Sequence, residues 1–136
     1  MKIKLDRGAY MPQRAHETDA GLDIRAKDSQ YVLAKDSAIF HTGVHIQLPH
    51  GYCGILVSKS GLNIHNDITS TGLIDEGYTG EILIKLFNHG GFDYKVNEGD
   101  KISQLIIVPV AYEKLVVVDE LEESDRGENG FGSSGR

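Results

Sequence analysis

The stretch VHIQLP, residues 44–49, alternates apolar and polar side chains along its whole length. Successive side chains of a β-strand point to opposite faces of the sheet, so the alternation predicts a strand with one buried face. EILIKLFN at 81–88 alternates less regularly, and ISQLIIVPV at 102–110 and KLVVVDEL at 114–121 are denser apolar runs of strand length. These stretches predict a chain built from short strands.

Turn-forming residues separate the apolar runs, in the clusters HTG, PHGYCG, DEGYTG, NHGG and NEGD. Glycine, asparagine, aspartate and proline are typical of tight turns. No long segment keeps a helical spacing of apolar residues, and SGLNIHNDI at 60–68 has room for only a short helix. We predict an all-β fold of about ten short strands that close into a sandwich or distorted barrel, with the functional residues in its turns.

The charge balance limits the class of partner. The chain of 136 residues suits one domain, and its 14 lysines and arginines against 20 aspartates and glutamates give a net charge of -6. This balance argues against a nucleic-acid partner, because binding one depends on neutralising many phosphates. A small polyanion such as a triphosphate fits if a few cations gather at one site, together with a divalent metal.

The cysteine content and the N-terminal sequence indicate a cellular compartment. Cys53 is the single cysteine, so the chain has no disulfide framework and suits a reducing cytoplasm. MKIKLDRGAY at the N-terminus contains no apolar signal segment, and no apolar run approaches the ~20 residues of a membrane span. We expect a soluble cytoplasmic protein with no membrane partner.

Six histidines raise the question of a zinc site. His41 and His45 are four residues apart, and in a regular strand this spacing places both on one face about 13 Å apart. That distance is too long for two ligands of one metal ion, and no histidine pairs with a cysteine at zinc spacing. We therefore expect surface or core histidines.

TGLIDEGYTGE at 71–81 has the composition of a tight turn between two apolar strands, because glycine allows positive φ and aspartate caps its own turn. An ordinary hairpin explains the pattern. The functional alternative is that Asp75 orients a water molecule and that the ring of Tyr78 lies against a sugar. The stretch alone leaves both interpretations open.

Three further stretches carry polar groups that suit a phosphate or a metal. In AHETDAGLDIRA at 15–26, Asp23 is either a solvated charge or a carboxylate that holds the water shell of Mg²⁺. SKSG at 58–61 places a lysine and two hydroxyls on a turn whose N–H groups can face an anion. In GDKISQLI, Gln104 interrupts an apolar face and needs polar partners, in the backbone or in a ligand.

The last eleven residues, RGENGFGSSGR at 126–136, are mostly glycine and serine. This composition is typical of a disordered chain terminus. Arg126 and Phe131 also suit a mobile flap that clamps a phosphate chain and stacks on a base. The composition of the tail does not distinguish the two interpretations.

Taken in order, these stretches resemble one family. DAGLD, SKSG, GLIDEGYTGE, GDKISQLI and RGENGFGSSG occur in the sequence and approximate spacing of the motifs of homotrimeric dUTPases, from end to end of the chain. The resemblance implies a jelly-roll-like distorted β-barrel over residues 1–125 and a flexible C-terminal lid over residues 126–136. It also implies a homotrimer with sites between subunits that hydrolyses dUTP to dUMP and pyrophosphate with Mg²⁺.

The resemblance also implies roles for the residues of the hairpin stretch. Asp75 would orient the water that attacks the α-phosphorus, and the backbone around Leu73 and Ile74 would bind uracil. Tyr78 would pack under the deoxyribose and leave no room for a 2′-hydroxyl. Uracil suits such a site, because a backbone edge can match its two carbonyl acceptors and the N–H donor between them.

The other motifs would bind the phosphates and the metal. The resemblance implies phosphate contacts from the residues Lys59, Ser60, Gly61, Gln104, Arg126, Gly132, Ser133 and Ser134. Phe131 would stack on uracil, and Asp23 would sit in the outer shell of Mg²⁺. Two positions depart from the family pattern: Lys59 stands where arginine is usual, and Thr69 stands where many relatives place an asparagine that helps bind the base. Both departures concern substrate affinity more than the reaction.

Two other functions remain to be weighed. A dCTP deaminase shares the fold that the resemblance implies, but it needs a glutamate facing the base where this sequence has Lys85, and it leaves the tail motif unexplained. A nucleotide-gated regulatory protein, which binds dUTP and signals through a partner, is the alternative outside enzymes. Pyrophosphate release from dUTP, with dCTP and UTP assayed beside it, distinguishes these functions.

Overall fold

The structure, a computed structural model, describes residues 1–124 and residue 127. The described part contains one helix, α1 (Ser60–Asn66), and the strands β1 (Lys2–Leu5), β2 (Leu22–Arg25), β3 (Gln30–Val32), β4 (Ser37–Gln47), β5 (Tyr52–Val57), β6 (Ile68–Ile74), β7 (Glu81–Asn88), β8 (Tyr94–Val96) and β9 (Lys101–Pro109). The predicted all-β fold with at most one short helix is confirmed.

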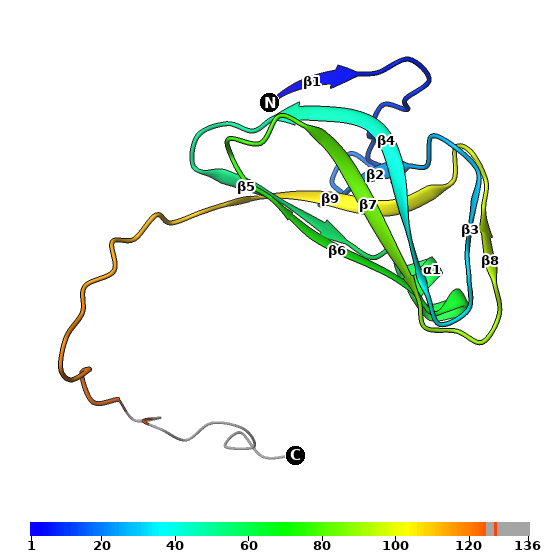
Figure 1. The fold of residues 1–136 in the computed structure, drawn as a ribbon. Coiled ribbons are helices and arrows are strands. Elements are labelled where there is room, and N and C mark those ends of the chain that lie inside the picture. Colours follow the sequence, from blue (N-terminus) through cyan, green and yellow to red (C-terminus); the bar gives the residue numbers. More distant parts are fainter. Residues whose placement is uncertain (125–126, 128–136) are drawn as a thin grey trace.

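Seven of the strands form one antiparallel sheet in the order β1-β4-β7-β6-β5-β9-β2, and β3 and β8 form a separate two-stranded ribbon. Figure 1 shows the large sheet curled, with β4 and β7 curving over β5, β6 and β9. The curled sheet encloses the apolar core, so the architecture is the predicted distorted barrel.

The core follows the alternation of the sequence. Along β7 the side chains of Ile82, Ile84 and Leu86 are buried, and the residues between them are more exposed. Val44 and Ile46 of β4 are buried in the same way. The two strands are neighbours in the sheet, and their inward residues pack into one cluster with residues of β2 and β9.

A bulge interrupts β4 beside β7. The pairing passes from His41 opposite Leu83 to His45 opposite Glu81, so β4 contains more residues than β7 over this interval. Gly43 lies in the bulge with a φ of 64°, and a Cβ there would come 2.8 Å from the Cβ of Ala9. Only glycine fits this position without a shift of the chain. The regular strand assumed in the sequence analysis for the two histidines is therefore wrong.

The helix lies where the sequence predicts it, and none of its residues is buried. It ends at Asn66, and the next residue, Asp67, takes a left-handed conformation with a φ of 54°. Within residues 1–124 and at residue 127, no helix is long and apolar enough to cross a membrane.

The apolar run at 114–121 does not form the strand that its composition predicts. β9 ends at Pro109, and Figure 1 shows the chain beyond it running away from the barrel. A strand requires a neighbouring strand, and residues 1–124 offer none along this path. Leu115 and Val117 are consequently 97% and 98% exposed. We call the described residues 110–124 the C-terminal arm.

Candidate functional site

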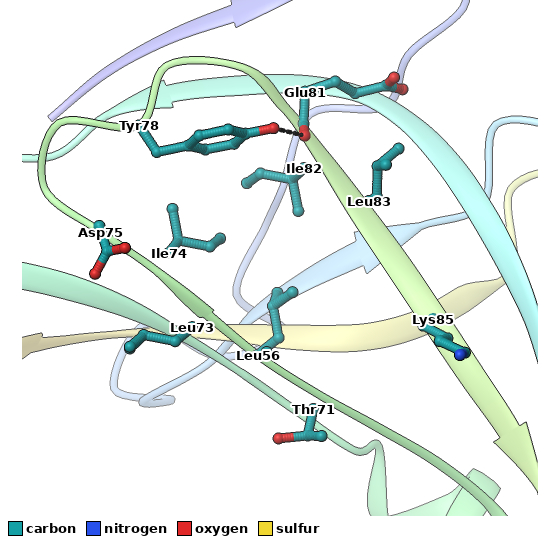
Figure 2. A pocket seen from close by; sticks show the side chains of 11 residues that line it. Leu56, Thr71, Leu73, Ile74, Asp75, Tyr78, Glu81, Ile82, Leu83 and Lys85 are labelled. Atoms are coloured by element: carbon teal, nitrogen blue, oxygen red, sulfur yellow. Dashed lines mark hydrogen bonds between the residues drawn. The ribbon is translucent and has the colours of Figure 1, made fainter.

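The β6–β7 hairpin opens into a cavity. The two strands pair with each other only where Ile68–Ser70 lies opposite Leu86–Asn88. Beyond this point β6 continues to pair with β5, and β7 continues to pair with β4, so the two strands separate. The space between them is a cavity of about 280 Å³. Figure 2 shows Asp75 and Tyr78 at one end of it and Thr71 and Lys85 toward the other.

Main-chain groups face this cavity. In an antiparallel sheet, alternate residues direct their N–H and C=O groups toward opposite neighbours. Along Thr71–Ile74 one set of these groups bonds to β5, and the other set points across the gap toward β7. The cavity therefore offers a row of backbone donors and acceptors between apolar side chains, which include Leu56, Leu73 and Ile82.

A tight turn closes the hairpin. The N–H of Tyr78 donates to the carbonyl of Asp75 at 3.0 Å, and the hydroxyl of Tyr78 donates to the carbonyl of Glu81 at 2.8 Å. The ring lies over Gly80, where a Cβ would come 2.5 Å from the hydroxyl oxygen. The carboxylate of Asp75 is exposed at the rim. The turn thus holds an aromatic ring and an exposed carboxylate at the same end of the cavity.

Glu76 connects the turn to two other segments of the chain, on the side away from the cavity. Its carboxylate accepts hydrogen bonds from the hydroxyl of Tyr112 at 2.6 Å and from the N–H of Gly51 at 2.9 Å, and it pairs with His50 at 2.8 Å. These contacts, the Tyr112 hydroxyl first, lower the pKa of Glu76 to about 2. The sequence analysis did not identify Glu76 as a bracing residue, because its partners lie 25 or more residues away.

A second cluster lies where β2 and β9 meet. Asp23, only 4% exposed, pairs through one oxygen with Lys59 at 2.5 Å and through the other with Lys101 at 2.7 Å. The amide of Gln104 donates to Asp23 at 3.3 Å. Burial alone would raise the pKa of Asp23, but the hydrogen bonds from Lys101 and Lys59 outweigh burial and lower it. The structure thus brings three predicted residues together and adds Lys101.

Lys101 was missed, although it lies within the GDKISQLI stretch. A lysine at the start of a strand normally projects into solvent, and only the pairing of β2 with β9 brings it to Asp23. Ser60 and Gly61 follow Lys59 at the exposed start of α1. Within the described residues, no group of three or more histidine, cysteine, aspartate or glutamate side chains could hold a metal ion.

Thr69 is outside the cavity. It lies on β6 before the strands separate, opposite Phe87, and its hydroxyl bonds to Nε2 of His89 at 2.7 Å. Its proposed contact with the base stays a prediction. Arg126, Phe131, Gly132, Ser133 and Ser134 lie outside the described residues.

The two clusters are far apart within one chain. Across the neighbouring strands β2, β9, β5 and β6, Asp23 pairs with Gln104, Gln104 with Val57, and Val57 with Thr71. Asp23 and Thr71 are therefore three strand spacings apart, or ~14 Å. Asp75 lies four residues beyond Thr71, ~13 Å farther along the strand direction. We call Lys59, Lys101 and Gln104, gathered around Asp23, the lysine cluster. The lysine cluster and the carboxylate of Asp75 therefore do not meet in a single chain.

The fold and these two groups of residues define a small antiparallel β-barrel protein with a cavity in an opened hairpin and a separate cluster of cations around Asp23. The sequence profile of the dUTPase family matches residues 7–135, and the chain belongs to this family. It is 45% identical to the deoxyuridine 5'-triphosphate nucleotidohydrolase of Clostridium acetobutylicum, over 99% of this chain and 96% of that protein. It is 42% identical to the enzyme of the same name from Tropheryma whipplei (strain Twist), over 97% of this chain and 93% of that protein.

Solved structures show the same fold. The dUTPase of Staphylococcus bacteriophage 80alpha, solved with dUPNHPP, superposes with a TM-score of 0.93 at 34% identity, covering 99% of this chain and 98% of that one. A mutant dUTPase of the S. aureus phage phi11, described with a structural Mg(II) ion, has a TM-score of 0.83 at 31% identity, covering 90% of this chain and 98% of that one. The predicted jelly-roll-like barrel is thereby confirmed.

Proposed function

We propose that this chain hydrolyses dUTP to dUMP and pyrophosphate. The observation that carries the proposal is the opened β6–β7 hairpin, which places a backbone edge, the ring of Tyr78 and the carboxylate of Asp75 around one cavity in a chain of the dUTPase family. Each of these parts suits a different part of the substrate.

The backbone edge suits uracil. Uracil has two carbonyl acceptors on either side of an N–H donor, and a strand edge presents donors and acceptors in the same alternation. Cytosine carries an amino donor at one of these positions, so it leaves a buried backbone N–H without a partner. Lys85 lines the cavity where a dCTP deaminase needs a glutamate, which supports dUTP over dCTP.

Tyr78 suits the sugar. Its ring is fixed at the hydroxyl by Glu81 and lies over Gly80, so it cannot move away easily from a bound nucleotide. A deoxyribose packs against such a ring, whereas the 2′-hydroxyl of a ribose would collide with it.

Asp75 suits the reacting water. Its carboxylate is exposed beside the cavity, and its backbone is held by the turn to Tyr78. It accepts a hydrogen bond from a water molecule, orients that water toward the α-phosphorus and takes up its proton. The bond to the leaving pyrophosphate then breaks as the new P–O bond forms.

The lysine cluster suits the phosphates. Lys59, Lys101 and Gln104 are donors already gathered in one place, and Ser60 and Gly61 add hydroxyl and backbone donors beside them. Since the described residues provide no inner shell for a metal, they fit Mg²⁺ held by phosphate oxygens and water, with Asp23 in the outer shell. Bound Mg²⁺ would neutralise negative charge on the triphosphate.

The separation of the two clusters supports a site shared between subunits. A homotrimer would bring the lysine cluster of one chain to the hairpin of another, which a single chain cannot do. The exposed apolar residues of the C-terminal arm support the same assembly, because contact with another subunit would bury them. In this assembly, residues 126–136 would act as the lid of the 1–125 domain. Arg126, Gly132, Ser133 and Ser134 would contact the phosphates, and Phe131 would stack on the base.

The test is pyrophosphate release by the purified full chain with Mg²⁺, measured with dUTP, dCTP and UTP in parallel. We expect release from dUTP and at least ~100-fold slower release from the other two nucleotides. Release of ammonia from dCTP would favour the deaminase. Binding of dUTP without any release would favour the nucleotide-gated regulatory protein.

A further inference from the structure

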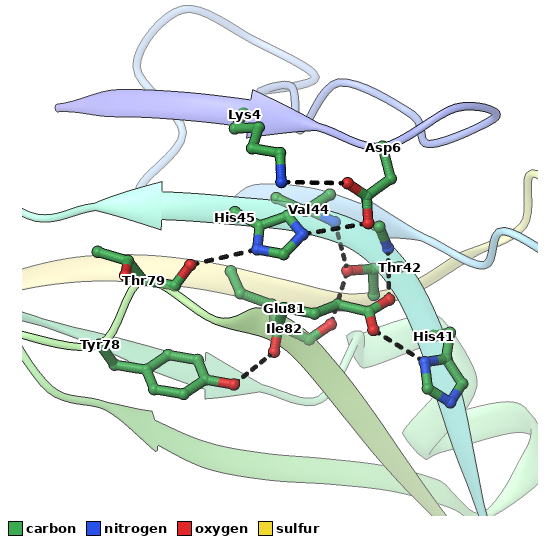
Figure 3. A network of polar contacts seen from close by, with 11 residues as sticks. Lys4, Asp6, His41, Thr42, Val44, His45, Tyr78, Thr79, Glu81 and Ile82 are labelled. Atoms are coloured by element: carbon green, nitrogen blue, oxygen red, sulfur yellow. Dashed lines mark hydrogen bonds and ion pairs between the residues drawn. The ribbon is translucent and has the colours of Figure 1, made fainter.

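His45 lies behind the turn that carries Tyr78. The side chain of His45 is 18% exposed, and it projects from β4 just after the bulge. Its Nδ1 lies 3.2 Å from the carbonyl oxygen of Thr79, and its Nε2 lies 3.1 Å from Oδ2 of Asp6. Figure 3 shows the ring between these two oxygens.

The Thr79 carbonyl belongs to the peptide bond that enters Gly80. The ring of Tyr78 rests on Gly80, so the orientation of this peptide determines where the ring can lie. The Tyr78 hydroxyl donates to the carbonyl of Glu81, two residues beyond Thr79. His45 thus holds the peptide on which the Tyr78 ring lies, and it is not among the residues that line the cavity.

Asp6 is itself held in place. Its N–H donates to the carbonyl of Gly43 at 2.8 Å, and Lys4 lies 3.6 Å from its carboxylate. The hydrogen bond from His45 is the first cause of the lowered pKa of Asp6, which keeps this carboxylate an acceptor. Both oxygens that face His45 are acceptors, so the ring makes both bonds when both of its nitrogens carry hydrogen.

We infer that His45 is a positioning residue: its contact with the Thr79 carbonyl fixes the position of the Tyr78 ring relative to the cavity. His45 thereby controls discrimination between deoxyribose and ribose. The inference rests on the proposed function. His41, on the same strand, offers the internal comparison, because its side-chain hydrogen bond among the described residues is to the carboxylate of Glu81 and not to the backbone of the turn.

In the decisive experiment, each of two variants removes one of the two hydrogen bonds of His45 and keeps the other. His45→Asn keeps a donor near the Nδ1 position and loses the contact with Asp6, whereas His45→Gln keeps a donor near the Nε2 position and loses the contact with Thr79. His45→Ala removes both, and His41→Ala is the control. The measured quantity is the ratio of kcat/KM for dUTP to kcat/KM for UTP.

We expect this ratio to fall by ~10-fold in His45→Ala and His45→Gln, and to stay within ~2-fold of wild type in His45→Asn and His41→Ala. An unchanged ratio in His45→Ala overturns the inference. So does an equal fall in His45→Asn, which would assign the effect to packing, or an equal fall in His41→Ala.

A second readout separates this inference from the proposed function. In the protein without nucleotide, amide hydrogen exchange at Gly80 and Glu81 should be faster in His45→Ala and His45→Gln than in wild type and His45→Asn. Equal exchange in all four proteins overturns the positioning role. If wild type releases no pyrophosphate from dUTP, the proposed function fails, while the exchange rates still report on the contact.

Discussion

The hydroxyl of Tyr112 donates a 2.6 Å hydrogen bond to the carboxylate of Glu76, the residue after Asp75 in the chain. This bond joins the start of the C-terminal arm to the hairpin that carries the proposed catalytic carboxylate. Since Tyr112 is the first of the causes that lower the pKa of Glu76, the bond can be followed through that pKa.

Replacing Tyr112 with phenylalanine should raise the pKa of Glu76 from about 2 toward its ordinary value. The Gly51 and His50 contacts remain, so the return should be partial. A carboxyl carbon NMR titration measures it. Tyr52→Phe is the control, because Tyr52 has no hydrogen bond to Glu76 among the described contacts. A Glu76 titration identical to wild type would show that the bond does not form in solution.

Glu76 should also contribute to stability in a defined pH range. Its pKa falls from 4.5 to about 2 on folding, so the ionised group stabilises the fold above pH 4.5, and this contribution disappears as the pH falls toward 2. Glu76→Gln should therefore be less stable than wild type at pH 7, and the difference should vanish near pH 2. Urea unfolding across this range measures the difference, with Glu113→Gln as an exposed control. A difference that does not change with pH would contradict the prediction.

Asp75→Asn should lower kcat by ~100- to 10,000-fold while dUTP still binds, because the change removes the group that orients the water and little contact surface. Rapid-quench kinetics measures kcat, and calorimetry with a non-hydrolysable dUTP analogue measures Kd. Asp28→Asn, in an exposed loop, is the matched control. Retention of more than about a tenth of kcat would exclude Asp75 from the catalytic role.

Lys101→Met should weaken both the fold and triphosphate binding. Asp23 is buried, and the substitution leaves its Oδ2 without the cation that lies 2.7 Å away in wild type. The expected loss of unfolding free energy is ~1–3 kcal/mol, with a higher KM for dUTP. Lys95→Met, at an exposed position of β8, should change neither. Unaltered KM and stability in Lys101→Met would exclude Lys101 from both the proposed phosphate binding and the stabilisation of Asp23.

A mixed assembly tests whether a site is shared between subunits. Asp75→Asn and a chain without residues 126–136 should each be inactive alone. After unfolding and random reassembly in equal amounts, about a quarter of the sites should contain both intact parts if these come from different subunits. Recovery near a quarter of wild-type activity supports the shared site. Inactivity after mixing has been verified by mass spectrometry would place both parts in one chain.

The fold was largely predictable, because alternation is a local property of the sequence. Ile82, Ile84 and Leu86 of β7 are buried as their spacing predicts. The same reasoning was wrong for the run at 114–121, which is not a strand. Its composition indicates which side chains a strand would bury, but it does not indicate whether a partner strand lies beside it. Its apolar side chains are exposed in the single chain.

The placement of the candidate site residues was predictable where a motif is continuous and not where it depends on strand pairing. Asp75 and Tyr78 lie within one stretch, and their placement follows from a turn of a few residues. The contact of Lys101 with Asp23 spans 78 residues from position 23 to position 101, and it requires the register of β2 on β9. The contact of His45 with Thr79 requires the bulge at Gly43. The HTG stretch at 41–43 was interpreted as a turn between apolar runs, but it lies inside β4, where its glycine forms the bulge.

The opened hairpin has an evolutionary consequence. Every residue except proline carries the same backbone N–H and C=O groups, so substitutions at Thr71, Leu73 or Leu83 leave the donors and acceptors facing the cavity unchanged. Under the proposed function, the part of the base preference that this backbone edge supplies is inherited with the strand pairing, and neutral drift at these three positions does not erode it. Changing the contribution of this backbone edge would require an insertion or a change of register, which displaces whole strands. A point mutation can alter base preference only at a side chain that faces the base, as at position 85 in the comparison with a dCTP deaminase.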